Sequence, residues 1–342
     1  MIIALDAMGG DFGPKIVAEG AYLFSKLYPS TRFLMCGDQA KIKPFISSDF
    51  ARKIDILHTE DEISPDTKPS AALRKKKSSM MISIDSVIKK EADAVVSSGN
   101  TGAFMALSLF NMGAIQGVFR PAIGGFLPNK NGDFSVMLDL GANSENDALQ
   151  LLQFAAMGEV LARIALNKDN PKIALLNIGS EDIKGNPTLQ KAAQLVREEN
   201  LFKNFIGFVE GDQLTSGDSD VIVADGFSGN IAIKSAEGAA KFTLSELKKA
   251  VSKSVLAKFG LLLAMRSLKA FQERLNPSNY NGAIFLGIQG IAVKSHGSTN
   301  AKGFCNAIKI AQTTAGMNLV EALQERLSLF PKGFLKGDRG GN

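Results

Sequence analysis

Residues 92–109 read ADAVVSSGNTGAFMALSL, and this stretch decides the fold. The apolar, β-branched run at 94–96 predicts a buried strand, the small polar residues at 97–102 a tight loop, and residues 103–109 the start of a buried helix. Such a loop presents backbone N–H groups and short polar side chains at the positive end of a helix, which suits an anion the size of phosphate. Gly99 and Gly102 allow the backbone to approach a ligand closely.

The same pattern of an apolar run followed by a Gly, Asn, Asp or Ser turn recurs elsewhere in the chain. The further examples are residues 3–6 before 7–11, 136–140 before 141–144, 174–177 before 178–181, and 221–225 before 226–230. In open parallel sheets ligands bind beyond the carboxyl ends of the strands, so we expect the five loops to face one crevice. The alternative is that these residues only form turns and helix caps. Five loops of one kind favour the ligand site.

The alternation of strand and helix patterns predicts one α/β unit of three layers, with helices on both faces of a mainly parallel, doubly wound sheet. We expect residues 1–330 to form a single catalytic domain. A helical segment at about 240–276 should protrude from it, and residues 331–342 should form a flexible tail.

The composition is that of a soluble globular protein, with 45% apolar and 21% charged residues among 342. Cys36 and Cys305 are far apart and lack metal-binding neighbours, so we expect no disulfide, no metal site and a reducing, cytoplasmic compartment. The amino terminus does not resemble a signal peptide, and we find no apolar run long enough to span a bilayer. The net charge of +5 is compatible with an acidic carrier protein, anionic lipid or nucleic acid. With no tryptophan and no alternation of basic and aromatic residues, nucleic acid is the least favoured and we expect none.

Familiar catalytic motifs are absent: there is no GxGxxG, GxxxxGK[ST], GxSxG or HExxH. A chain with few candidate nucleophiles and many anion-binding loops indicates that the substrate brings the nucleophile. Inorganic phosphate is already an anion, so its attack on an acyl carbon requires positioning and charge neutralisation, which a lysine and several amide donors supply. The loop at 175–186, LLNIGSEDIKGN, is the most reactive in composition, although a surface loop with an incidental ion pair would look the same.

Two basic segments each allow more than one interpretation. The run RKKK at 74–77 is either a solvated helix face or a docking patch for an acidic partner. The apolar tip FGLLLAM at 259–265 lies between lysines and arginines and is suited to oligomer packing, to shallow insertion into an anionic membrane, or to an ordinary core. The residues expected to dock on a membrane are Phe259, Leu261, Leu262 and Leu263.

Seven segments together resemble the bacterial phosphate acyltransferase (PlsX) family, in order and in spacing, over essentially the whole chain to about residue 312. They are IALDAMGGD, AVVSSGNTGA, LDLGAN, LLNIGSEDIKGN, GFVEG, ADGFSGN and VKSHGS. The chain departs from the family at Phe12, where histidine is more frequent, at Ser98, where alanine is usual, and at Ser228, where valine is common.

The resemblance implies a fold similar to the isocitrate/isopropylmalate dehydrogenase-like and phosphotransacetylase group, in a homodimer that associates peripherally with the membrane. It also implies the reaction of an acyl thioester of acyl carrier protein with inorganic phosphate, which gives acyl phosphate and free carrier. The product would pass to a membrane glycerol-phosphate acyltransferase in phospholipid synthesis. Neither a metal nor a nicotinamide cofactor is expected. The alternatives are a phosphotransacetylase-like enzyme that uses acyl-coenzyme A and a non-catalytic scaffold for acyl carrier or membrane.

We predict that Lys184 neutralises phosphate or the developing oxyanion, and that Asn230 donates a hydrogen bond to the same charge. Asn100, Thr101 and Asn143 are expected to position the substrate. The full set predicted to bind substrate or phosphate is Asp6, Gly9, Gly10, Asp11, Ser98, Asn100, Thr101, Gly102, Asn143, Asn177, Glu181, Gly185, Asp225, Gly229, His296 and Ser298.

Overall fold

The computed structural model describes residues 1–252, 265–266, 273 and 276–335. Within that part of the chain, eleven strands form one sheet in the order β3-β2-β1-β4-β11-β10-β5-β6-β9-β7-β8. The strands are β1 (Ile2–Asp6), β2 (Arg32–Gly37), β3 (Ile54–His58), β4 (Ala94–Ser97), β5 (Ala122–Pro128), β6 (Phe134–Leu138), β7 (Ile173–Leu176), β8 (Phe205–Val209), β9 (Val221–Val223), β10 (Ala283–Leu286) and β11 (Ala292–Lys294).

The sheet consists of two parallel halves that run in opposite directions. Strands β3, β2, β1, β4 and β11 are parallel to one another, and so are β6, β9, β7 and β8. Between them β10 and β5 pair antiparallel with each other and with both halves. The five loops therefore leave the sheet in two opposite directions, because β6, β7 and β9 point the opposite way from β1 and β4.

A stagger along β5 nevertheless brings carboxyl ends from both halves to the same level. The first residues of β5 pair with β10, with Gly124 opposite Ile284, and the later ones pair with β6, with Gly125 opposite Met137. On the other side of β10, Ala283 pairs with Lys294, the last residue of β11. The carboxyl ends of β6 and β11 thus approach the same point in the middle of the sheet.

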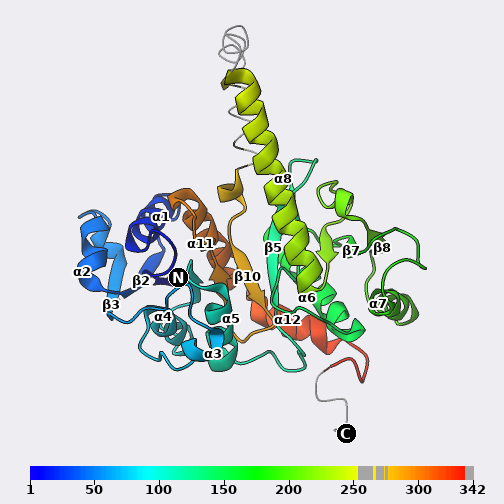
Figure 1. Ribbon diagram of the computed structural model, residues 1–342. Coiled ribbons are helices and arrows are strands. Elements are labelled where there is room, and N and C mark those ends of the chain that lie inside the picture. The colour runs from blue at the N-terminus through cyan, green and yellow to red at the C-terminus, as the bar shows by residue number, and fades with distance from the viewer. Residues whose placement is uncertain (253–264, 267–272, 274–275, 336–342) are drawn as a thin grey trace.

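Helices cover both faces of the sheet, which confirms the three-layer α/β fold (Figure 1). The core follows strand alternation: Leu5 packs with the helices of one face, whereas the neighbouring Ala4 packs with those of the other. One face carries α1 (Pro14–Leu27), α6 (Ala148–Leu166), α7 (Pro187–Glu198), α11 (Ala301–Gly316) and α12 (Leu319–Ser328). The other carries α3 (Pro69–Ala72), α4 (Ser79–Ile88), α5 (Thr101–Met112) and the start of α8 (Gly226–Ser252). The short helix α2 (Gln39–Ile42) follows β2.

Helix α8 starts against the sheet and ends far from it (Figure 1). Its first turns pack Ala232 and Ile233 on the sheet, whereas Phe242 is 68% exposed. The described end of α8 includes the beginning of the segment at about 240–276, and the prediction for that segment as a whole stays a prediction. The membrane-docking residues Phe259, Leu261, Leu262 and Leu263 lie outside the described residues.

Helix α6 is, among the described helices, the one long and apolar enough to cross a membrane by length and composition. The expectation that no apolar run reaches that length is therefore wrong. In its most apolar window 67% of the residues are buried inside the protein, and the helix packs on β6, β9, α7, α11 and α12. Its apolar surface is thus accounted for by the core.

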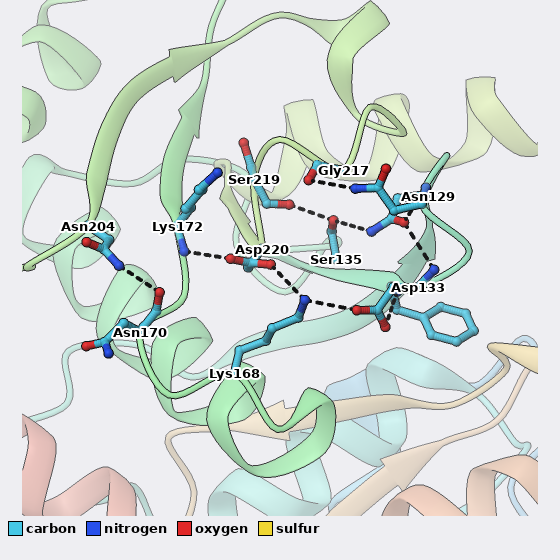
Figure 2. A network of polar contacts seen from close by, with 12 residues as sticks. Asn129, Asp133, Ser135, Lys168, Asn170, Lys172, Asn204, Gly217, Ser219 and Asp220 are labelled. Atoms are coloured by element: carbon cyan, nitrogen blue, oxygen red, sulfur yellow. Dashed lines mark hydrogen bonds and ion pairs between the residues drawn. The ribbon is translucent and has the colours of Figure 1, made fainter.

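A polar network joins the amino ends of β6, β7 and β9, away from the loops that follow these strands (Figure 2). Lys168 Nζ lies 3.0 Å from a carboxylate oxygen of Asp133 and 3.5 Å from one of Asp220. Asp220 also accepts the N–H of Lys172, and Ser135 Oγ donates to the carbonyl of Ser219 at 2.6 Å. The lysine holds the pKa of Asp133 below its usual value. These contacts fix the starts of three strands.

The described part of the expected tail, residues 331–335, packs against the body. The Phe334 ring lies edge-on to Phe330 with 6.3 Å between centroids, and its carbonyl accepts from Gln153 Nε2 at 3.1 Å. The flexible tail at 331–342 stays a prediction, since residues 336–342 lie outside the described part of the chain.

Candidate active site

A cavity of about 1280 Å3 lies where the carboxyl ends of the two halves meet. It is lined by the loops after β1, β4 and β11, by the middle of β5, by residues 140–142 after β6, and by the first turns of α8. Of the predicted residues, those that line it are Gly10, Asp11, Ser98, Asn100, Thr101, Gly102, Asn230, His296 and Ser298. Those that do not are Asp6, Gly9, Asn143, Asn177, Glu181, Lys184, Gly185, Asp225 and Gly229.

Asp6 lies beneath the cavity and holds two loops in place. It is 1% exposed and accepts hydrogen bonds from Ser79 Oγ at 2.7 Å and Ser97 Oγ at 2.6 Å. Burial raises the pKa of Asp6, and the two serine hydroxyls oppose that rise. A Cβ on Gly9 would lie 2.6 Å from Gly99 N, so only glycine allows the loops after β1 and β4 to pack this closely. Both Asp6 and Gly9 therefore support the cavity from below.

The three loops of the first half are bonded to one another. Ser98 Oγ donates to the carbonyl of Gly9 at 2.8 Å, which joins the β4 loop to the β1 loop. The N–H of Asp11 donates to the carbonyl of Gly297 at 3.0 Å, which joins the β1 loop to the β11 loop. We call the part of the cavity formed by the loops after β1, β4 and β11 its polar end. The hydrogen bonds between these loops make the polar end a rigid, preorganised surface.

The Asn100 side chain caps helix α5 and also bonds a neighbouring loop. Its Oδ1 accepts from the N–H of Ala103 at 2.9 Å, and its Nδ2 donates to the carbonyls of Pro65 and Thr67 at 2.6 and 3.0 Å. The capping interpretation therefore holds for this side chain, which fixes the rim of the cavity. The first N–H groups of α5, those of Thr101 and Gly102, have no acceptor within the helix.

The loop after β11 brings a buried lysine to the cavity. Lys294 is 8% exposed, and its Nζ donates to the carbonyls of Ser98, at 3.3 Å, and Ser295. Burial lowers the pKa of Lys294 to about 8, against the opposing influence of Asp6 and Asp11. The sequence pattern drew attention to its neighbour His296, whose Nδ1 lies 3.0 Å from Ser298 Oγ, and missed the lysine itself.

Asp139 organises the second half of the site in the same way that Asp6 organises the first. It is 0% exposed, and its carboxylate accepts from the N–H groups of Ile123, Gly141, Ala142 and Asn143 at 2.8 to 3.2 Å. Asn143 Nδ2 also donates to it, at 2.9 Å, so this amide shapes the loop rather than lining the cavity. Burial raises the pKa of Asp139, and the hydrogen bonds oppose the rise.

The first turn of α8 packs directly on the Asp139 loop and thereby places Asn230. Asp225 caps the helix, accepting from Ser228 N and Ser228 Oγ, both at 2.8 Å. A Cβ on Gly229 would overlap the carbonyl oxygen of Asp139, so the close approach requires glycine. Asn230 then lies beside Gly141, at the cavity wall.

Lys184 lies in the exposed β7–α7 loop. Asn177 Nδ2 holds that loop by donating to the carbonyls of Gly179 and Lys184 at 3.1 and 3.2 Å. Gly185 has a φ of +86°, and a Cβ there would overlap Asn177 Oδ1. Since β7 pairs in parallel with β9, the loop leaves the sheet beside the one that leads to Asn230. Glu181 and Lys184 are exposed and do not line the cavity.

Apolar side chains form another part of the cavity lining. The sequence patterns did not predict them, because those patterns concern the loops and most of these side chains lie on helices and strands. They come from α5, β5, the β6 loop and α8, and are Met105, Ile123, Phe126, Leu140, Ala142 and Ile233. One cavity therefore offers both polar and apolar surfaces. Among the described residues, no group of three His, Cys, Asp or Glu side chains is placed to hold a metal ion.

The fold places this chain in a known structural class, that of the phosphotransacetylases and related dehydrogenase-like proteins. The fold is similar to that of a phosphotransacetylase from Streptococcus pyogenes, with a TM-score of 0.60 at 16% identity over 93% of this chain and 94% of that one. It is also similar to a putative 4-hydroxythreonine-4-phosphate dehydrogenase from Salmonella typhimurium, with a TM-score of 0.52 at 11% identity over 92% and 98%. The expected phosphotransacetylase and dehydrogenase-like fold group is confirmed.

Sequence comparison then identifies the family. The profile described as "Fatty acid synthesis protein" matches residues 1–322. A relative from Rhodospirillum rubrum, named phosphate acyltransferase, is 45% identical over 331 residues, which cover 96% of this chain and 95% of the relative. The chain belongs to the phosphate acyltransferase family, a family of acyltransferase enzymes.

Proposed function

We propose that the protein transfers an acyl group from the thioester of an acyl carrier protein to inorganic phosphate, forming the acyl phosphate used in bacterial phospholipid synthesis. The observation that carries this proposal is a single cavity with a rigid polar end and an apolar lining. The polar end suits phosphate, and the apolar side chains suit a hydrocarbon chain.

The reaction needs little from the protein beyond positioning and charge stabilisation. A phosphate oxygen attacks the carbonyl carbon of the thioester and forms a C–O bond, and the carbonyl oxygen becomes an oxyanion. The intermediate then expels the sulfur as a thiolate, which is protonated to give the free carrier. Holding both reactants in line supplies much of the rate enhancement, and hydrogen-bond donors aimed at the oxyanion supply the rest.

Asn230 and Lys184 are the proposed catalytic residues. Asn230 lines the cavity and has a side-chain amide for the oxyanion. Lys184 carries an exposed positive charge on the neighbouring loop, where it would neutralise phosphate or the oxyanion. Variants of Asn230 and of Lys184 test the two roles separately, because Asn230 lines the cavity and Lys184 does not.

Met105 tests the apolar lining as the site of the acyl chain. Met105→Trp enlarges a side chain on α5 that lines the cavity, so kcat/KM for long acyl chains is expected to fall at least about tenfold relative to short ones. Steady-state kinetics with a series of acyl chain lengths measures this ratio. Phe110→Trp is the matched control, since Phe110 lies on the same helix and is 74% exposed. An unchanged ratio in Met105→Trp would place the chain elsewhere.

The reaction itself is tested by incubating the purified protein with phosphate and an acyl donor and trapping acyl phosphate as a hydroxamate. Formation with acyl carrier protein, and at least tenfold less with acyl-coenzyme A, supports the proposal. Preference for acyl-coenzyme A would support the phosphotransacetylase-like alternative. No product with either donor, together with binding of the acylated carrier, would support a non-catalytic scaffold.

An acidic carrier finds basic residues beside the cavity. Lys234 and Lys241 on α8 are exposed and line it. The basic run at 74–77 is also exposed but lies beside Asp61 and Glu62, which reduce its net charge. Glu237 on α8 also lines the cavity and reduces the positive charge there. Both basic surfaces are therefore candidates for contact with the carrier, and the α8 lysines are the ones that line the cavity itself.

We further propose a cytoplasmic homodimer that associates peripherally with the membrane and delivers its product to a membrane glycerol-phosphate acyltransferase. Support comes from the sequence of residues 259–263, and from α8, which leads to them and carries exposed Phe242 and Leu247 beside basic residues. Each basic group near an anionic surface adds about 1 kcal/mol of attraction.

Changing Leu261 and Leu262 to Glu is expected to abolish sedimentation with anionic liposomes, because two added carboxylates oppose both insertion and charge attraction. Acyl phosphate formation in solution should stay within about twofold of the wild type. The matched control changes Leu27 and Leu329, which are 69% and 71% exposed on the body, to Glu. Liposome binding that survives the change at 261 and 262 would assign these leucines to packing within the protein or dimer.

A further inference from the structure

The loop after β11 places a buried cation, Lys294, in the lining of the cavity. Lys294 is 8% exposed and lines the cavity. Among the described residues it forms no ion pair, and its Nζ donates only to two carbonyls, those of Ser98 and Ser295. An ammonium group carries three N–H donors, so one remains for a ligand in the cavity.

We propose that Lys294 binds the phosphate substrate directly, with its Nζ donating a charge-assisted hydrogen bond to a phosphate oxygen. The inference rests on the proposed function and adds a phosphate-binding residue to Asn230 and Lys184. Lysine is suited to this task as a compact point charge, and the low dielectric around a buried group strengthens its attraction for an anion.

The charges that face Lys294 explain why the position is available for an anion. Asp6 approaches from β1 and is already committed to two serine hydroxyls. Asp11 approaches from the β1 loop, and His296 follows on the β11 loop. Burial lowers the pKa of Lys294 to about 8, and Asp6 and Asp11 oppose that effect. At pH 7 the lysine is therefore mostly charged, and a bound phosphate anion would add a direct ion pair to the attraction of Asp6 and Asp11.

The energetics separate a ligand-binding lysine from a structural one. Desolvation of the buried Lys294 charge outweighs the attraction of Asp6 and Asp11, so the charged lysine destabilises the fold at neutral pH. Lys294→Met should therefore leave the melting temperature at pH 7 unchanged or raise it. A lysine kept for its structural bonds to the Ser98 and Ser295 carbonyls would behave in the opposite way.

The test compares Lys294→Met, Lys294→Arg and the control Lys309→Met, which removes an exposed lysine from α11. The measurements are calorimetric binding of inorganic phosphate, the KM for phosphate, the KM for the acyl donor, and the melting temperature. We expect Lys294→Met to raise the phosphate KM at least tenfold and to lose phosphate binding, with the acyl-donor KM within twofold. Lys309→Met should match the wild type.

A pH series sharpens the comparison. Between pH 7 and 9 the wild type should lose phosphate affinity as Lys294 loses its proton, whereas Lys294→Arg should keep whatever affinity it has, because arginine stays charged. An unchanged phosphate KM and binding in Lys294→Met would overturn the inference. So would a lower melting temperature with equal increases in both KM values. Lys294-dependent phosphate binding by a wild-type protein that forms no acyl phosphate would support this inference and reject the proposed function.

Discussion

Replacing Asn230 with alanine is expected to lower the turnover number for acyl phosphate formation by about a hundredfold, the usual loss for one oxyanion donor. The amide lies at the cavity wall beside Gly141, where α8 meets the loop held by Asp139. Because the change removes a polar group from a partly exposed side chain, the melting temperature should stay near that of the wild type. Hydroxamate trapping under saturating phosphate and acyl donor measures the turnover number.

Ser235→Ala is the matched control for Asn230→Ala. Ser235 is exposed on the same helix and does not line the cavity, so its turnover should equal that of the wild type. Wild-type turnover in Asn230→Ala would exclude the amide from the reaction. Lys184→Ala, measured in parallel, decides the role of the β7–α7 loop. A loss of similar size would make its lysine catalytic, and near-normal turnover in a folded protein would remove it from the mechanism.

Replacing Asp139 with alanine is expected to destabilise the protein by about 3 kcal/mol, because four backbone N–H donors, one buried and three partly buried, lose their acceptor at once. The carboxylate holds the loop at 141–143 and, through it, the start of α8. Turnover should fall together with stability, since Asn230 depends on that packing. Urea unfolding followed by circular dichroism measures the change in midpoint.

Two further variants interpret the Asp139→Ala result. Asp133→Ala is the matched control at the opposite end of the same strand, where the carboxylate is partly exposed, and it should cost about 1 kcal/mol or less. Asp139→Asn keeps one acceptor oxygen but turns an NH2 group toward N–H donors, so it should fall between the wild type and alanine. A midpoint for Asp139→Ala equal to that of Asp133→Ala would show that water replaces the lost acceptor.

The sequence predicted the local units of the fold well. Each of the five strand-and-turn patterns corresponds to a strand in the structure, because buried parallel strands are short apolar runs and their turns need small residues. The reversal between the two halves was not predictable from these patterns. The reversal depends on β10 and β5. Their apolar sequences indicate that they are buried but do not indicate the direction in which they pair.

The site was predicted less completely, and the reason is physical. Asn100, Asn143 and Asp225 satisfy backbone N–H groups, a task that uses the same residue types as ligand binding. Lys294 was missed because a lysine beside an apolar run resembles a surface residue until the chain around it is folded. The apolar lining takes one or two residues from each of four separate segments, so no local sequence pattern predicts it.

The position of β11 in the sheet also affects folding during translation. β11 fills the gap between β4 and β10, yet it is translated roughly 200 residues after β4, which takes about 10–40 s at ordinary ribosomal speeds. If the first strands pair before synthesis ends, the edge of β4 that β11 covers in the finished sheet has no partner strand during this interval. An unpaired strand edge can pair with the edge of another chain and cause aggregation. We therefore expect the yield of soluble protein to rise when more chaperone is available during synthesis.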